Sequence, residues 1–328
     1  MRELDLLERI YQRSRDLGAG GSLVKVGPGD DCAVLAGAAR PDGSPDDLLI
    51  TVDHLIEGRH YFGPLLASAP GSPVQPGTPI DAAARKGVAR SVSDIAAMGG
   101  TPRWSLGTVT FPPPFPHDHA EALCAAVAQH ARAWGCPMVG GDIAGAPGPV
   151  VMTITVAGSP HPRRGAVLRS GARPGDAVWI TGRVGGALAS GRHLTFEPRV
   201  IEGQWLAGLA LERHDPHAPS PLHAMIDVSD GLGLDAGRIA HASGVTLVLE
   251  AARLPLHEGV SDWRAGVGDG EDYELLFTCD PALDLPERVP GTGTLLTRIG
   301  TVREAGAPDL PAGPRALVLD ERSALIDV

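Results

Sequence analysis

IDVSDGLGLDAGRIAHASGV, at residues 226–245, is the stretch in which a strand pattern passes directly into a helix pattern. Asp227 comes after apolar residues, and SDG at 229–231 precedes a segment with apolar side chains at helical spacing. This pattern predicts a helix over residues 230–243. Because the first N–H groups of a helix and its dipole favour negative charge, the junction is suited to a phosphate group.

The rest of the chain alternates between the same two patterns. Strands are predicted at 48–53 (LLITVD), 105–111, 150–157, 177–181, 245–250 and 273–278, and helices at 3–17, 82–98 and 118–134. Such mixing predicts an α/β or α+β class. Residues 63–80 are rich in Pro, Gly and Ser and predict a long loop or insertion. SPHPRRG at 159–165 interrupts the pattern, so we place a boundary there between domains 1–160 and 161–328.

The composition narrows the class of protein. A chain of 328 residues is more than a single core usually serves, and 43% hydrophobic residues can bury a large core. The net charge is −11, and no basic run is present, so we expect no nucleic-acid partner. The absence of a long apolar run argues against a membrane protein, and the acidic N-terminal segment is unlike a signal peptide. Four irregularly spaced cysteines predict neither disulfides nor a zinc site, so we expect a cytoplasmic protein.

Aspartates recur at strand ends and beside glycines. The five places are Gly29-Asp30-Asp31, Thr51-Val52-Asp53, Ser93-Asp94, Gly140-Gly141-Asp142 and Asp227-Val228-Ser229-Asp230-Gly231. Any one Gly-Asp pair is most often a turn. Together they are more informative, because Asp53 ends an apolar strand and Asp94 lies in a predicted helix directly before the apolar residues 95–98, where a carboxylate needs a compensating charge. Without a P-loop motif, they favour Mg²⁺ ions that join carboxylates to nucleotide phosphates.

Seven motifs occur in the order typical of one family. They are GDDCAVL (29–35), TVDHLIEGRHY (51–61), SVSDIAAMGGTPRW (91–104), GGDIAG (140–145), RSGARPGD (169–176), IDVSDGLGLDAGRIAHASGV (226–245) and GDGEDYELLFT (268–278). The set resembles the thiamine-monophosphate kinases, of the aminoimidazole ribonucleotide synthetase superfamily. The resemblance implies an α/β N-terminal domain plus an α+β C-terminal domain, and a homodimer with ATP sites near the subunit interface. The implied reaction is direct, in-line transfer of the ATP γ-phosphoryl group to thiamine phosphate, assisted by several Mg²⁺ ions.

The resemblance also implies a role for individual residues. Mg²⁺ contacts fall on Asp31, Thr51, the Val52 main chain, Asp53, Asp94, Asp142, Asp227 and Asp230, with catalytic roles for Asp53, Asp142 and Asp230. ATP contacts fall on Gly141, Asp142, Arg169 and Ser229. His60 and Glu271 match the positions that bind the thiamine moiety. On this basis, residues 1–160 hold most of the metal-binding aspartates and the dimer interface, and residues 161–328 complete the ATP and substrate sites.

The chain departs from the family on the acceptor side. The family usually ends in an aromatic segment, but no Trp, Tyr, Phe or His follows Phe277 here. Ser91 stands where the family commonly has Asn. Two alternatives therefore stay open. One is another ATP-dependent enzyme of the superfamily, such as a selenophosphate synthetase or an aminoimidazole ribonucleotide synthetase, and the other is a weakly active regulatory paralogue that binds Mg-nucleotide. EDYELLFT favours the thiamine enzyme, and Cys32 lies in the wrong context for a selenophosphate synthetase.

Overall fold

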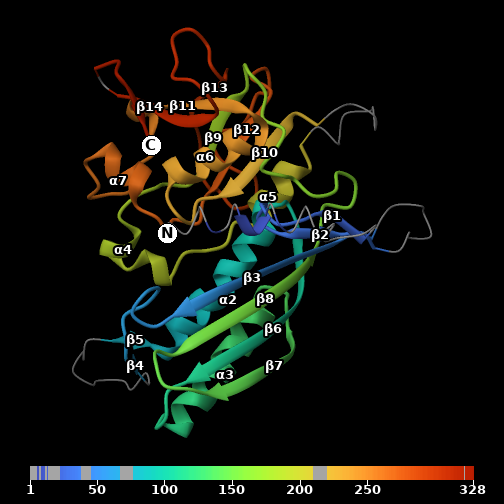
Figure 1. The fold of residues 1–328 in the computed structure, drawn as a ribbon, viewed down its shortest axis with the longest axis vertical. Helices are drawn as coiled ribbons and strands as arrows, with labels where there is room; N and C mark the ends of the chain where they lie inside the picture. The colour runs from blue at the N-terminus through green and yellow to red at the C-terminus, as the bar shows by residue number, and fades with distance from the viewer. Residues whose placement is uncertain are drawn as a thin grey trace.

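The computed structural model describes residues 6, 9–11, 13, 23–37, 46–66, 77–209, 220–320 and 322–328. These residues form a six-stranded sheet in the first half of the chain and a seven-stranded sheet in the second half (Figure 1). Most of the helix predicted at 3–17 and the middle of the predicted 63–80 insertion lie outside the described residues.

The first sheet has the strand order β1-β2-β3-β8-β6-β7. Its strands are β1 (Val24–Val26), β2 (Ala33–Leu35), β3 (Leu48–Ile56), β6 (Thr101–Phe111), β7 (Met138–Gly145) and β8 (Val151–Ser159). Neighbouring strands are antiparallel except for the parallel pair β6 and β7. Beside the sheet, β4 (Leu65–Leu66) pairs with β5 (Thr78–Pro79).

Two helices, α2 (Ile80–Ala97) and α3 (His117–Ala133), lie on the same face of this sheet (Figure 1). Both are rich in alanine, a strong helix former, and α2 buries Val88, Val92 and Ile95 completely. Side chains of strand β3, which lies beneath these helices, point alternately towards the helices and towards the other face of the sheet. Leu49 and Leu55 are buried on the helix side, whereas Val52 is 59% exposed on the other, open face of the sheet.

Strand β3 is longer than predicted. The prediction ended it at Asp53, but pairing with β8 continues through Asp53 opposite Ile154 and on to Ile56 opposite Val151. Asp53 therefore does not end the strand. It lies in the strand on the helix side, and its carboxylate faces α2.

Strand β7 corrects a second prediction. A Gly-Asp pair usually marks a turn, but Gly141 and Asp142 lie within this edge strand, beside Gly107 and Thr108 of β6. A Cβ added at Gly141 would come within 2.0 Å of the Gly107 carbonyl oxygen. Glycine is therefore required for the close approach of the two strands, and it also hid the strand from pattern analysis.

The second sheet has the order β10-β12-β9-β13-β11-β14-β15. Its strands are β9 (Ala177–Thr181), β10 (Leu222–Asp227), β11 (Val245–Glu250), β12 (Leu275–Cys279), β13 (Leu296–Glu304), β14 (Arg315–Leu319) and β15 (Leu325–Asp327). Helix α6 (Leu232–Ser243) packs on it. The second half also contains the shorter helices α4 (Ala187–Ser190), α5 (Val200–Ala207) and α7 (Trp263–Gly268), and the single turns η2 (Arg192–Leu194) and η3 (Ala251–Arg253). The predicted strands at 177–181 and 245–250 coincide with β9 and β11.

Helix α2 also joins the two halves. Its last residue, Ala97, is buried in one cluster with Leu206 and Ala207 of the α5 helix and Met225 of β10. Gly203 of α5 lies so close to α2 that an added Cβ would meet the Ala96 carbonyl oxygen at 2.2 Å. The two sheets divide between β8 and β9, while the allotment of the dimer interface to residues 1–160 stays a prediction. Among the described residues, no helix is long and apolar enough to cross a membrane.

Candidate active site

Three of the predicted metal ligands meet where the halves join. Asp31 lies in the loop before β2, Asp94 in the last turns of α2, and Asp227 at the end of β10. Each offers one carboxylate oxygen within 4.8 Å of the others. Asp31 and Asp227 are buried, at 7% and 2% exposed. Since all the donors are hard oxygens, the cluster fits Mg²⁺ better than a soft metal.

The cluster carries more negative charge than its surroundings stabilise. Burial raises the pKa of Asp94 well above its ordinary value, and the neighbouring Asp53 and Asp227 raise it further. Burial also raises the pKa of Asp227, with a contribution from Asp31. The Thr51 hydroxyl donates to Asp94, but it does not offset the burial. A bound cation would remove this cost, which is the physical reason to assign a metal here.

Arg169 connects the cluster to the second half of the chain. Its Nη2 lies 2.7 Å from Asp31 Oδ1, and its Nε donates to Asp31 Oδ2 at 3.2 Å. Its main-chain N–H donates to Asp30 Oδ2 at 3.2 Å. Burial and the nearby Asp31 raise the pKa of Asp30 to about 6. Arg169, predicted to contact ATP, thus lies directly beside the proposed metal ligands.

Asp53 lies beside the cluster, on the α2 side of β3. Arg90 Nη2 approaches Asp53 Oδ1 at 3.4 Å. Burial raises the pKa of Asp53, and Arg90 opposes this effect. A carboxylate in this position can extend the charged surface from the cluster towards the predicted substrate residues.

The start of α6 differs from the prediction. The helix was predicted from residue 230 but begins at Leu232, so the N–H groups of Ser229 and Asp230 precede it, and both donate to Asp235 Oδ2, at 3.0 and 3.1 Å. Asp235 is fully buried, and burial raises its pKa to about 7 although Arg238 lowers it. The Asp230 side chain is 55% exposed and pairs with Arg238 at 2.5 Å. An anion would have to compete with Asp235 for these two N–H groups.

The two predicted substrate residues meet at Lys86. The Nζ of Lys86 lies 2.7 Å from Glu271 Oε2 and donates to the His60 carbonyl oxygen at 2.6 Å. The His60 ring accepts at Nδ1 from the Ile56 N–H at 2.9 Å. Burial, with Arg90 and Lys86, lowers the pKa of His60 to about 3. The ring is therefore neutral near pH 7, with its remaining proton on Nε2 as a donor.

The backbone around Glu271 is strained. Glu271 and Tyr273 have φ angles of 70° and 53°, in the left-handed region that non-glycine residues rarely adopt. The predicted strand at 273–278 accordingly begins later, at Leu275. The Tyr273 hydroxyl donates to Glu271 Oε2 at 3.0 Å, and its ring stacks on Phe196 with centroids 3.8 Å apart. Such strain concentrates at functional sites. The Glu271 carboxylate itself is held by Lys86 and by the Tyr273 hydroxyl.

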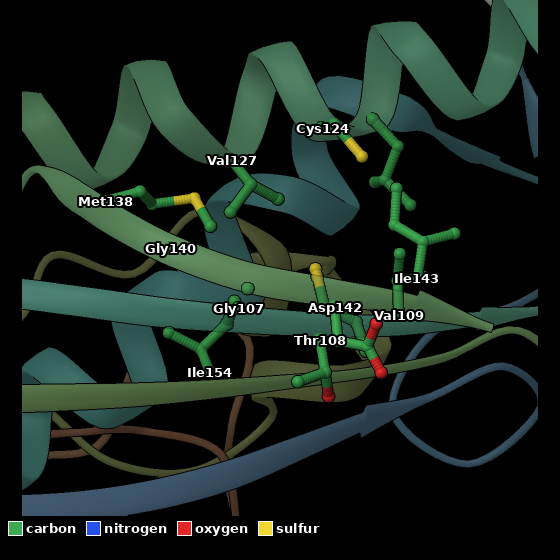
Figure 2. A pocket seen from close by; sticks show the side chains of 13 residues that line it. Gly107, Thr108, Val109, Cys124, Val127, Met138, Gly140, Asp142, Ile143 and Ile154 are labelled. Carbon is green, nitrogen blue, oxygen red and sulfur yellow. The ribbon is translucent and has the colours of Figure 1, made fainter.

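The structure does not bring Gly141 and Asp142 to the other site residues. They lie on the exposed edge strand β7, three strands from β3 and hence about 14 Å away. Figure 2 shows the Asp142 and Thr108 side chains directed away from α3, towards the open face. A cavity of about 320 Å³ between β7 and α3 is lined mainly by apolar side chains and lies apart from the aspartate cluster. The roles assigned to Gly141 and Asp142 stay predictions.

Comparisons with known proteins identify the family of the chain. A family model described as AIR synthase related protein, N-terminal domain, matches residues 29–159. The thiamine-monophosphate kinase of Rhodopirellula baltica is 32% identical over 312 residues, covering 92% of this chain and 89% of that protein. The chain belongs to the thiamine-monophosphate kinase family. The thiamine-monophosphate kinase of Escherichia coli is 30% identical over 305 residues, covering 84% of this chain and 82% of that protein.

Solved structures of thiamine-monophosphate kinases share the fold. AaThiL complexed with AMPPCP and TMP superimposes with a TM-score of 0.67 at 26% identity, over 97% of this chain and 95% of that chain. The thiamine-monophosphate kinase of Stenotrophomonas maltophilia superimposes with a TM-score of 0.65 at 26% identity, over 94% of this chain and 95% of that chain. HypE in the HypE-HypF complex, at 15% identity and a TM-score of 0.66, shares the fold alone. The predicted family, fold class and enzyme class are confirmed.

Sequence analysis missed two charged residues of the candidate site, Lys86 and Arg90. The Lys86 side chain is completely buried, and that of Arg90 is 16% exposed. Both lie on α2 at intervals of four residues from Asp94, so the three side chains share one face of the helix. That spacing was visible in the sequence, as charged residues placed on a helix face that is otherwise apolar.

Proposed function

We propose that this protein transfers the γ-phosphoryl group of ATP to thiamine phosphate, giving ADP and thiamine diphosphate. Its membership of the family supports the reaction, as does the relative whose structure contains AMPPCP and TMP. The observation that carries the proposal is the carboxylate cluster of Asp31, Asp94 and Asp227, which helix α2 connects to His60 and Glu271. The carboxylate cluster suits metal-bound phosphates, and Glu271 with His60 suits a cationic organic group.

The metal in this proposal is Mg²⁺, held around the carboxylate cluster. The proposed ligands are Asp31, Thr51, the Val52 main chain, Asp53, Asp94, Asp142, Asp227 and Asp230. When bound, Mg²⁺ neutralises phosphate charge and orients the transferred group. Arg169 and Ser229, with Gly141 and Asp142, are proposed to bind ATP. The guanidinium of Arg169 already lies against Asp31, where it can bind a phosphate oxygen next to the metal.

The protein has little proton chemistry to perform in this reaction. The acceptor atom is a phosphate oxygen that is already anionic, so direct in-line transfer needs positioning rather than a strong base. His60 is neutral, and its Nε2–H is available as a donor to the thiamine moiety. Glu271 offers a carboxylate to the positively charged thiazolium or to the amino group of the pyrimidine. Lys86 holds Glu271 in place for that role.

The proposal includes a homodimer that packs through the open face of the first sheet. Val52 and Leu106, 59% and 37% exposed, belong to one row across that face. His54, Thr108 and Asp142 belong to the neighbouring row, with Thr153 between His54 and Thr108. Face-to-face packing would bring Gly141 and Asp142 of one subunit towards β3 of the other. This arrangement gives Asp142 a route to a nucleotide site that its own subunit does not provide.

The proposal is tested by measuring ADP release with ATP and Mg²⁺, in the presence and absence of thiamine phosphate. We expect release that depends on thiamine phosphate and is not supported by unphosphorylated thiamine. Equal release without thiamine phosphate would show that the γ-phosphoryl group goes to water and would overturn thiamine phosphate as the acceptor. Nucleotide binding without release under any of these conditions would indicate a regulatory paralogue.

A further inference from the structure

Helix α2 carries a line of three charged side chains from the proposed acceptor pocket to the metal cluster. Lys86, Arg90 and Asp94 are spaced four residues apart, so each lies about 6 Å further along the same face. Lys86 contacts Glu271 and the His60 carbonyl, and Asp94 belongs to the carboxylate cluster. Arg90 lies between them. The proposed function gives Lys86 and Asp94 a task but leaves Arg90 without one.

Arg90 has more donors than its surroundings use. Its Nη2 reaches Asp53 Oδ1 at 3.4 Å, a long contact for an ion pair. Its Nε and Nη1 are buried, and neither has a hydrogen-bond partner among the described residues. Buried guanidinium N–H groups are costly to leave unpaired, so this arrangement suits a residue that serves a ligand.

An arginine guanidinium stays protonated in proteins, so Arg90 carries a full positive charge. A permanent positive charge therefore lies between two sets of carboxylates, one assigned to metal and one to the thiamine moiety. An anion entering this region would gain the charge and at least three N–H donors, from Nε and Nη1.

We propose that Arg90 binds the phosphate group of the acceptor, a phosphate monoester, and holds it between the thiamine moiety and the γ-phosphoryl group of ATP. This inference rests on the proposed function. Its position favours the acceptor over the nucleotide, because Arg90 is one turn of α2 from the residue that contacts His60 and Glu271. Arg169, the arginine assigned to ATP, lies instead at Asp31.

The competing explanation is that Arg90 only balances the charge of Asp53. The two roles differ in one measurable quantity, the preference of the protein for thiamine phosphate over unphosphorylated thiamine. If Arg90 only balances the charge of Asp53, its replacement would affect metal binding but would change the affinities for thiamine phosphate and thiamine by the same factor. A phosphate-binding residue affects only the acceptor that carries the phosphate.

The experiment is isothermal titration calorimetry with thiamine phosphate and with thiamine, each with Mg²⁺ and AMPPCP present. Arg90→Gln should raise the Kd for thiamine phosphate about 10-fold to 100-fold, whereas the Kd for thiamine should change by less than about twofold. Arg90→Lys, which keeps the charge, should retain part of the preference. Arg85→Gln is the matched control, because Arg85 lies on the same helix and pairs with Glu197 outside the site. It should behave as the parent protein.

An Arg90→Gln variant that keeps the parent's preference for thiamine phosphate would overturn the inference, while the proposed function would stand. If Arg90→Gln does not fold, Arg90→Lys is measured in its place. A preference for thiamine phosphate over thiamine that is unchanged in Arg90→Lys, together with an unchanged KM for thiamine phosphate, contradicts the proposed binding of the acceptor phosphate by Arg90. A parent protein that binds neither acceptor, while still binding AMPPCP, would instead refute the proposed function. The two failures are therefore distinguishable.

Discussion

Replacing Asp94 with asparagine should separate stability from function. Two full charges 4.8 Å apart repel by about 3.5 kcal/mol at an effective dielectric constant of about 20. Arg169 offsets part of the charge on Asp31, and partial protonation limits the repulsion. We therefore expect Asp94→Asn to raise the free energy of unfolding by about 1–3 kcal/mol when Mg²⁺ is absent. The asparagine carbonyl can still accept from Thr51, so the packing is conserved.

The assay is thermal unfolding in EDTA and in Mg²⁺. Each kcal/mol moves Tm by about 2–4 °C for domains of about 150–250 residues, so the gain in EDTA should be several degrees. Mg²⁺ should stabilise the parent, by about 2.7 kcal/mol at 100 times its Kd, and should stabilise Asp94→Asn much less. The exposed Asp118 of α3 provides the control, since Asp118→Asn removes the same charge away from the cluster.

The gain in stability of Asp94→Asn in EDTA should also depend on pH. The pKa of Asp94 is raised in the folded protein, so its carboxylate costs stability above that pKa and costs less as protonation increases. The advantage of Asp94→Asn should thus be largest near pH 8 and shrink towards pH 5. An Asp94→Asn protein that melts no higher than the parent in EDTA, yet responds fully to Mg²⁺, would refute the reasoning.

Three further predictions concern turnover. Asp53→Asn and Asp142→Asn should each nearly abolish turnover and weaken Mg·ATP binding while circular dichroism is unchanged; near-normal rates at saturating Mg²⁺ would rule out these assignments. Activity should fall to background in EDTA and return with Mg²⁺ but not with zinc, because the ligands are all oxygens; activation by zinc without a response to Mg²⁺ would contradict this. His60→Ala or Glu271→Ala should raise the KM for thiamine phosphate about tenfold or more and leave the KM for ATP nearly unchanged, and an equal rise in both constants would argue against a specific acceptor role.

The parts of the fold that sequence analysis predicted well are those with regular apolar spacing. Helix α2 and strands β9 and β11 follow from such spacing, which local packing enforces. Strand β7 was missed because its glycines lack side chains to show alternation, although the approach to Gly107 requires them. The end of β3 was misplaced because Asp53 and His54 are polar in a strand whose pairing with β8 continues past them.

The site was predictable only in part for a related reason. Asp31, Asp94 and Asp227 were identified by their local contexts, and the fold brings them within 4.8 Å. The pairing of Lys86 with Glu271 joins α2 to the loop before β12, and no local pattern encodes such a contact. The role of Asp235, which accepts from the N–H groups of Ser229 and Asp230 before α6, likewise could not be predicted without the tertiary structure.

Transfer of a labelled phosphoryl group tests the central claim most directly. The protein would be incubated with Mg²⁺, thiamine phosphate and ATP carrying ³²P in the γ position, and the products separated by chromatography. The account predicts that the label appears in thiamine diphosphate, in amounts equal to the ADP formed, and that omission of thiamine phosphate prevents ADP formation. Label found only in inorganic phosphate, or no turnover although the protein binds both ligands, would contradict it.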